Sequence, residues 1–215
     1  MKTLKILFIC LFLSNLNAVA QFGNIYGNRM GGVDRSNQIP QSNEPKEPTP
    51  EEIASAICER TAVVTATHVD YRSAHILDAA SITRAAHQHG ALMVWDLAHT
   101  TGAVPFNASE LDIDFAVGCG YKYLNGGPGA PAFIYVAPRL LETASQPLQG
   151  WFGHALPFEF ELAYRPAEGI ARFLTGTANV LSMKSLEAAL EVFDSVAMAD
   201  IRVKNQSLTG FFIEI

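Results

Sequence analysis

Short apolar runs alternate with longer segments of helical spacing along residues 51–215. Short runs of mostly apolar residues are typical of strands that are buried on both faces. The runs that we expect to form such strands are residues 62–66, 92–95, 115–117 and 133–136. The segments that we expect to form helices are residues 51–58, 77–89, 139–144 and 182–198. This alternation predicts an α/β fold in which helices cover both faces of a mainly parallel sheet.

The first fifty residues have a different pattern. Lys2 and Lys5 precede the apolar run 6–13, and a small-x-small pattern follows at residues 18–20. This is the layout of a secretory signal peptide, so we expect residues 1–20 to be a signal-like segment rather than a buried strand. Residues 21–50 are rich in Gly, Asn, Pro and Ser, which predicts a disordered linker before the folded part of the chain.

Composition narrows the classes of function. Apolar residues make up 49% of the chain and charged residues 17%, which is typical of a globular domain. The net charge of -6 argues against nucleic acid as a partner, because nucleic acid requires a basic face. The three cysteines and six histidines show no spacing of a structural metal site, so no metal is expected. We also expect no membrane contact once the signal-like segment is removed.

Candidate chemistry follows two of the predicted strands. Asp96 ends one strand run, and Tyr121 and Lys122 follow another, so the parallel sheet should place them at one edge. A pyridoxal phosphate enzyme needs a lysine amine, a carboxylate for the pyridine nitrogen, a ring face and phosphate donors, and His99 adds the ring. The alternatives are a turn cap for Asp96, a packing role for His99 and a solvated surface position for Lys122. The loop 125–129 lacks the spacing of a nucleotide P-loop and can be a simple turn.

Five segments of the chain resemble the kynureninases. The string YKYLNGGPG at residues 121–129 is far more specific than a generic aminotransferase lysine motif. In chain order the five segments are residues 67–73, 95–105, 118–129, 150–154 and 169–177. The resemblance extends from about residue 51 to about residue 212, and it implies the large domain of a fold-type-I enzyme that depends on pyridoxal 5'-phosphate.

The resemblance also implies a role for each matching residue. Lys122 would hold the cofactor as a Schiff base, and Asp96 would pair with the pyridine nitrogen. His99 would lie near the ring and its 3-oxygen. Tyr121 would bind the phosphate and assist proton transfer, so that Lys122, Asp96 and Tyr121 are the catalytic set. The remaining cofactor contacts that the resemblance implies are Trp151 at the phosphate and the hydroxyl groups of Thr67 and Thr177.

The function implied is that of a hydrolase in tryptophan catabolism and the route toward NAD. It would cleave L-kynurenine to anthranilate and L-alanine, or 3-hydroxykynurenine to 3-hydroxyanthranilate and L-alanine. The resemblance implies a homodimer, because some cofactor contacts of this family cross the subunit interface. It also implies a cytoplasmic location, whereas residues 1–20 favour secretion.

The chain departs from the family pattern at both ends. An upstream segment with further cofactor contacts and a C-terminal domain with a carboxylate-binding arginine are not found in this sequence. Residues 51–215 are therefore expected to be a partial large domain that is truncated at both ends and has little activity alone. Two alternatives stay open: a non-catalytic fragment that keeps part of a pyridoxal phosphate site, and another carbon–sulfur or aminotransferase chemistry on the same fold.

Overall fold

The computed structural model describes residues 48–215. The signal-like segment lies outside the described residues, and so does the predicted linker except for its last three positions. Helix α2 (Pro50–Ala56) begins there, with Thr49 as its N-cap. The Thr49 hydroxyl accepts a hydrogen bond from the backbone N–H of Glu52, and the Glu52 carboxylate accepts one from the Thr49 backbone N–H. This reciprocal cap satisfies two donors that a helix start would otherwise leave unpaired.

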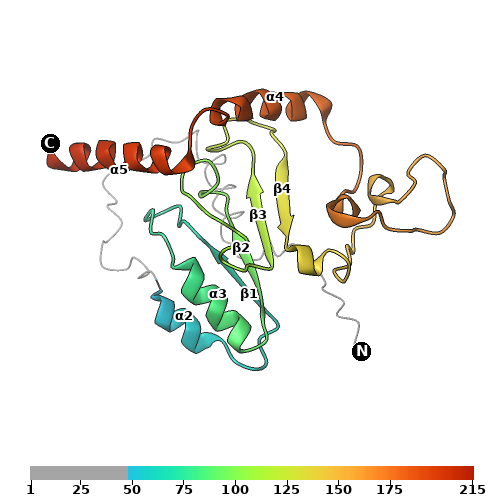
Figure 1. Ribbon diagram of the computed structural model, residues 1–215, viewed down its shortest axis with the longest axis horizontal. Helices are drawn as coiled ribbons and strands as arrows, with labels where there is room; N and C mark the ends of the chain where they lie inside the picture. The colour runs from blue at the N-terminus through green and yellow to red at the C-terminus, as the bar shows by residue number, and fades with distance from the viewer. Residues whose placement is uncertain (1–47) are drawn as a thin grey trace, which may run out of the picture.

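Four strands form one mixed sheet in the order β1-β2-β3-β4 (Figure 1). The strands are β1 (Val63–Thr67), β2 (Leu92–Asp96), β3 (Phe115–Cys119) and β4 (Ala132–Val136). The first three are parallel, whereas β4 pairs antiparallel with β3 at the edge. The expectation of a mainly parallel sheet is confirmed. The chain returns from β3 to β4 through a loop that contains no helix, and such a loop reverses the chain instead of carrying it back to a parallel start.

Helix α3 (Ala79–Gln88) covers one face of the sheet (Figure 1). It begins at Asp78, whose side chain accepts a hydrogen bond from the backbone N–H of Ser81. Beneath it, the indole N–H of Trp95 donates to the Thr83 hydroxyl at 3.0 Å, so this buried aromatic side chain has its polar atom satisfied. The core on this face includes Ile82, Ala86, Met93, Trp95, Ile113 and Ala116.

Short 3-10 helices cover part of the opposite face. Phe115 and Val136 project from the sheet here and pack with Ala144 and Phe173. The nearby segments are η3 (Pro138–Leu140) and η5 (Gly169–Phe173), so the helix expected at 139–144 is only a single 3-10 turn that starts with a proline. Flanking helices are thus present on the sheet, but this face has no long helix among the described residues.

The C-terminal part of the chain forms two helices instead of the single one expected at 182–198. Helix α4 (Val180–Leu190) passes into the 3-10 turn η6 (Glu191–Phe193), and helix α5 (Met198–Glu214) begins after an extended Ala197. No side chain of α4 or α5 is buried. None of the helices in the described part of the chain is long and apolar enough to cross a membrane.

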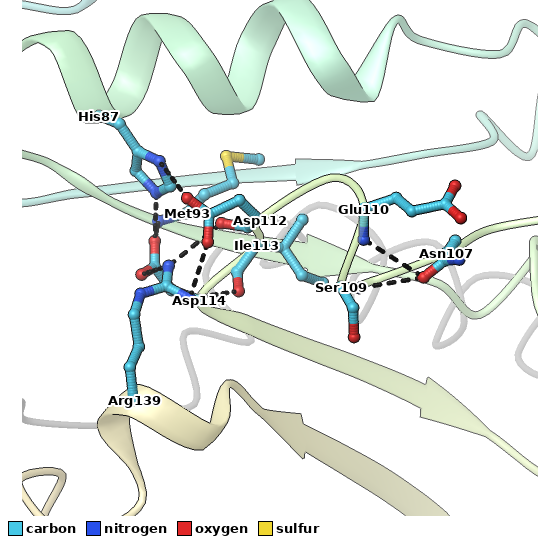
Figure 2. Close-up of polar contacts among 9 residues, drawn as sticks. All are labelled: His87, Met93, Asn107, Ser109, Glu110, Asp112, Ile113, Asp114 and Arg139. Atoms are coloured by element: carbon cyan, nitrogen blue, oxygen red, sulfur yellow. Dashed lines mark hydrogen bonds and ion pairs between the residues drawn. The ribbon is translucent and has the colours of Figure 1, made fainter.

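A buried carboxylate connects three elements at the amino edge of the sheet (Figure 2). Asp114 is only 2% exposed. It accepts hydrogen bonds from the backbone N–H of Met93 at 2.7 Å and from the Arg139 guanidinium at 2.7 Å. It also lies 2.8 Å from Nε2 of His87 on α3. Asp114 therefore joins β2, α3 and the start of η3, and its charge is compensated by Arg139.

We expect Asp114→Asn to lower the free energy of unfolding by about 1.5–3 kcal/mol, because it weakens hydrogen bonds to a charged group that is buried. The matched control is Asp112→Asn. Asp112 pairs with the same Arg139 at 3.1 Å but is 71% exposed, and asparagine tolerates its positive φ of 48°. This exposed pair should contribute about 0–1 kcal/mol. Urea unfolding measures both, and equal losses would contradict the role of Asp114.

Candidate active site

The carboxyl ends of β2 and β3 bring Asp96 close to the loop that follows β3. Asp96 is the last residue of β2, and its Oδ1 accepts a hydrogen bond from the backbone N–H of Ala98 at 2.8 Å. Asp96 therefore does cap a turn, through the backbone N–H of Ala98. Its second oxygen, Oδ2, accepts no hydrogen bond within the described part of the chain, and this leaves one carboxylate oxygen for a ligand.

Lys122 meets His99 at this edge. The Lys122 Nζ lies 2.9 Å from Nε2 of His99 and 5.5 Å from the centre of the Tyr121 ring. A lysine ammonium can only donate, so Nε2 of His99 is the acceptor and the imidazole carries its proton on Nδ1. The side chain of Lys122 is thus held between an imidazole and an aromatic ring, unlike a lysine that extends freely into water.

The charges around His99 favour its neutral form. Burial lowers the pKa of His99 below its ordinary value, and the charge of Lys122 lowers it further. The carboxylates of Asp96 and Asp70 act in the opposite direction but do not reverse the shift. Below the ordinary pKa of histidine, the unfolded chain takes up a proton that the folded chain resists. His99 therefore destabilises the fold as the pH falls through that range and has no such effect above it.

A close backbone approach sets the distance between the His99 turn and the Lys122 loop. A Cβ on Gly102 would lie 2.5 Å from the carbonyl oxygen of Tyr123, and Gly102 has a φ of +89°, so only glycine fits there. Gly102 therefore allows the two loops to pack backbone against backbone. Within the Lys122 loop itself, a Cβ on Gly126 would approach the carbonyl oxygen of Gly120 to 2.8 Å, so the loop closes tightly on itself there.

A buried histidine supports the same turn from the β1 side. His68 packs between Trp95 and Phe106, and its Nδ1 lies 3.0 Å from the Thr100 hydroxyl. Burial lowers the pKa of His68, so this imidazole is also neutral at neutral pH. None of the described residues that line the neighbouring hollow of about 840 Å³, His68 and Phe106 among them, is a lysine.

Tyr71 is the residue that the sequence did not single out. Its ring stacks on the His99 imidazole with a centroid distance of 6.3 Å and an interplanar angle of 25°. Tyr71 lies in the turn after β1, where Oδ1 of Asp70 accepts hydrogen bonds from the backbone N–H groups of Arg72 and Ser73. An Asp followed three residues later by Ser, directly after a strand of the same parallel sheet, is the signal that could have indicated this turn.

The structure brings together five of the seven predicted cofactor residues. Thr67 is the register partner of Asp96 at the end of β1, so it joins Asp96, His99, Tyr121 and Lys122 at the edge. Trp151 and Thr177 show no contact with these five residues among the described side chains. Trp151 packs on Phe152 and Phe158 in the segment of η4 (Trp151–Gly153), which lies beyond β4 (Figure 1).

This edge thus combines an amine, a neutral imidazole, a free carboxylate oxygen and two aromatic rings. The family model described as aminotransferase class-V matches residues 37–214. The chain belongs to the aminotransferase class-V family.

Two similar relatives point to a narrower group within this family. The chain is 47% identical over 167 residues to a kynureninase of Pseudomonas fluorescens, a match that covers 78% of this chain and 40% of the relative. It is 50% identical over 165 residues to a kynureninase of Deinococcus radiodurans, which covers 77% of this chain and 40% of the relative. The chain therefore spans about 40% of the length of the curated relatives that it matches.

Solved structures of the same fold confirm the expected architecture. A cysteine desulfurase from Thermococcus onnurineus NA1 superposes with a TM-score of 0.65 at 21% identity, covering 94% of this chain and 48% of the other. A C-DES mutant with glycine covalently linked to its PLP cofactor superposes with a TM-score of 0.63 at 20% identity, covering 74% and 42%. The fold-type-I expectation is confirmed by these likenesses.

We expect Lys122→Met to raise the pKa of His99, because the substitution removes the positive charge that faces Nε2. Burial remains, so the pKa should stay below the ordinary value of histidine. Asp70→Asn should have the opposite effect and lower the pKa further, since it removes a carboxylate that favours the imidazolium. NMR titration of the imidazole ring protons measures both shifts, and a His99 that titrates identically in all three proteins would contradict this electrostatic assignment.

Proposed function

We propose that the protein acts as a kynureninase-type hydrolase that uses pyridoxal 5'-phosphate, with Lys122 as the residue that holds the cofactor. The observation that carries the proposal is the position of Lys122 Nζ, 2.9 Å from His99 Nε2 at the carboxyl edge of the sheet. Identities of 47% and 50% to two kynureninases support this activity over the carbon–sulfur chemistry of fold neighbours that are only about 21% identical.

The donor set at this edge fits pyridoxal phosphate. The free Oδ2 of Asp96 suits a protonated pyridine nitrogen, and the amine of Lys122 suits the aldehyde carbon. The half-exposed ring of Tyr121 presents a hydroxyl donor for a phosphate oxygen. His99 offers a flat neutral face to the cofactor ring. These four residues come from two adjacent loops, so one small molecule can reach all of them.

The cofactor, when bound, supplies an electron sink for a carbanion at the substrate's α-carbon. The chain supplies the proton transfers. Lys122 would hold the cofactor, and its amine, once free, would take the α-proton and later return a proton. Neutral His99 accepts a hydrogen bond from Lys122 and so holds the amine in position for attack. Asp96 keeps the pyridine nitrogen protonated, so that the ring can accept electrons.

The substrate in this proposal is L-kynurenine or its 3-hydroxy form. Water adds to the side-chain ketone, the Cβ–Cγ bond breaks, and anthranilate or 3-hydroxyanthranilate leaves. The remaining three carbons take up a proton and leave as L-alanine. We also propose that the protein forms a homodimer, in which Trp151 and Thr177, which do not contact Lys122 among the described residues, would serve the site of a second copy.

We expect pyridoxal phosphate to attach to Lys122. The full chain is incubated with the cofactor, borohydride makes the attachment permanent, and the modified peptide is identified by mass spectrometry. Lys184 and Lys204 are internal controls, because both are exposed on helices α4 and α5, away from any imidazole contact among the described residues. Modification of either control with Lys122 unmodified would contradict the assignment.

We expect Asp96→Asn to keep cofactor attachment at Lys122 while lowering anthranilate release from L-kynurenine by about 10- to 160-fold. This range corresponds to the loss of a charge-assisted hydrogen bond of about 1.5–3 kcal/mol. Anthranilate fluorescence gives the rate, and Asp112→Asn at the opposite edge is the matched control. Near-normal turnover of Asp96→Asn would show that Asp96 serves only as a turn cap. Because the chain is expected to have little activity alone, the rate is measured at high protein concentration. No anthranilate even then, with the cofactor attached, would contradict the substrate and leave the cofactor assignment standing.

A further inference from the structure

Tyr71 contacts the candidate site although its side chain is mostly in water. The ring is 70% exposed, yet it lies 6.3 Å from the His99 imidazole, centroid to centroid, with planes inclined by 25°. This centroid distance lies in the range of offset stacking between aromatic rings. An exposed tyrosine without a structural role would extend into water. Tyr71, in the turn after β1, instead lies nearly parallel to His99, in the turn after β2.

The turn that carries Tyr71 is rigidly built. Oδ1 of Asp70 accepts hydrogen bonds from the backbone N–H of Arg72 at 2.8 Å, from the backbone N–H of Ser73 at 2.9 Å and from the Ser73 hydroxyl at 3.1 Å. The backbone N–H of Ala74 also donates to the carbonyl of Asp70 at 3.0 Å. Four bonds to one residue fix the direction in which the next side chain, Tyr71, leaves the backbone.

The imidazole of His99 has few other restraints. Its Nε2 contacts Lys122, but no hydrogen bond engages its Nδ1 within residues 48–215. A histidine ring with one hydrogen-bonded nitrogen can still rotate about its Cβ–Cγ bond, since this torsion has a broad energy profile. The stack against Tyr71 restricts that rotation, because turning the imidazole out of the parallel arrangement would lose the ring contact.

We propose that Tyr71 is a positioning residue for the candidate reaction, whose ring holds the His99 imidazole with Nε2 directed at Lys122. The inference rests on the proposed role of Lys122 in holding the cofactor. Tyr71 touches neither Lys122 nor Asp96 in the described contacts, so it acts through His99 alone. Its hydroxyl makes no hydrogen bond among the described residues, so we assign the effect to the aromatic ring and not to the hydroxyl group.

The test compares Tyr71→Phe, Tyr71→Leu and Tyr71→Ala in the full chain, with Tyr123→Ala as the matched control. Tyr123 is a half-exposed tyrosine next to Lys122 that makes no ring contact with His99. The first measurement is the NMR titration of His99 without cofactor. The charged groups that act on His99, which are Asp70, Asp96 and Lys122, are unchanged in every variant. The pKa should rise toward its ordinary value in Tyr71→Ala, because water reaches the uncovered ring face, and stay unchanged in Tyr71→Phe and Tyr123→Ala.

The second measurement is the rate at which pyridoxal phosphate is captured at Lys122 under borohydride. Tyr71→Ala and Tyr71→Leu should be slower by about 2- to 12-fold, the range that one aromatic pair provides, while Tyr71→Phe should match the unaltered chain. A His99 that titrates alike in Tyr71→Ala and Tyr123→Ala, or a Tyr71→Phe that behaves as Tyr71→Ala, would overturn the proposal. Failure of every protein to capture the cofactor would contradict the proposed function, whereas the His99 titration would still decide the role of Tyr71.

Discussion

The parallel register of β1, β2 and β3 is the constraint on which the site depends. Thr67 pairs with Asp96, and Asp96 pairs with Val117, two residues before the end of β3, so the carboxyl ends of the three strands lie at one edge of the sheet. The turn that carries Tyr71, the turn that carries His99 and the loop that carries Lys122 all leave the sheet from this edge. Residues that are 23 positions apart in the chain, such as His99 and Lys122, meet at 2.9 Å because their strands run in the same direction.

The amino edge of this sheet stabilises the fold, whereas the carboxyl edge carries the candidate site. At the amino edge, Asp114 is buried and its oxygens are taken by Met93, His87 and Arg139, so its polar groups serve the fold (Figure 2). At the carboxyl edge, one oxygen of Asp96 is unused and Lys122 is only half-buried. A buried network whose hydrogen bonds are all made adds rigidity. An accessible group without a protein partner can exchange its water for a ligand. The rigid edge thus holds the strands whose other ends carry the chemistry.

The sequence predicted the strands and the edge better than the details that complete them. Apolar runs located β2 and β4 within a residue or two, because burial on both faces leaves a continuous signal. The same signal is identical for either strand direction, so it did not predict that β4 is antiparallel. The break after Leu190 was missed, since both sides of it have helical composition. Asp96 and Lys122 were placed correctly by the fold rule, but the stack of Tyr71 on His99 depends on tertiary geometry that no local pattern contains.

What separates Lys122 from an ordinary surface lysine is therefore not burial but its neighbours. The side chain remains partly in water, and a solvated lysine would fit its exposure equally well. Its Nζ, however, lies above the Tyr121 ring and against an imidazole kept neutral by burial and by Lys122 itself. The charge of Lys122 disfavours protonation of His99, and this leaves Nε2 of His99 as the available acceptor. A hydrogen bond to that acceptor holds the Lys122 amine at the edge where Asp96 has a free oxygen, and this positioning is what a covalent role for Lys122 requires.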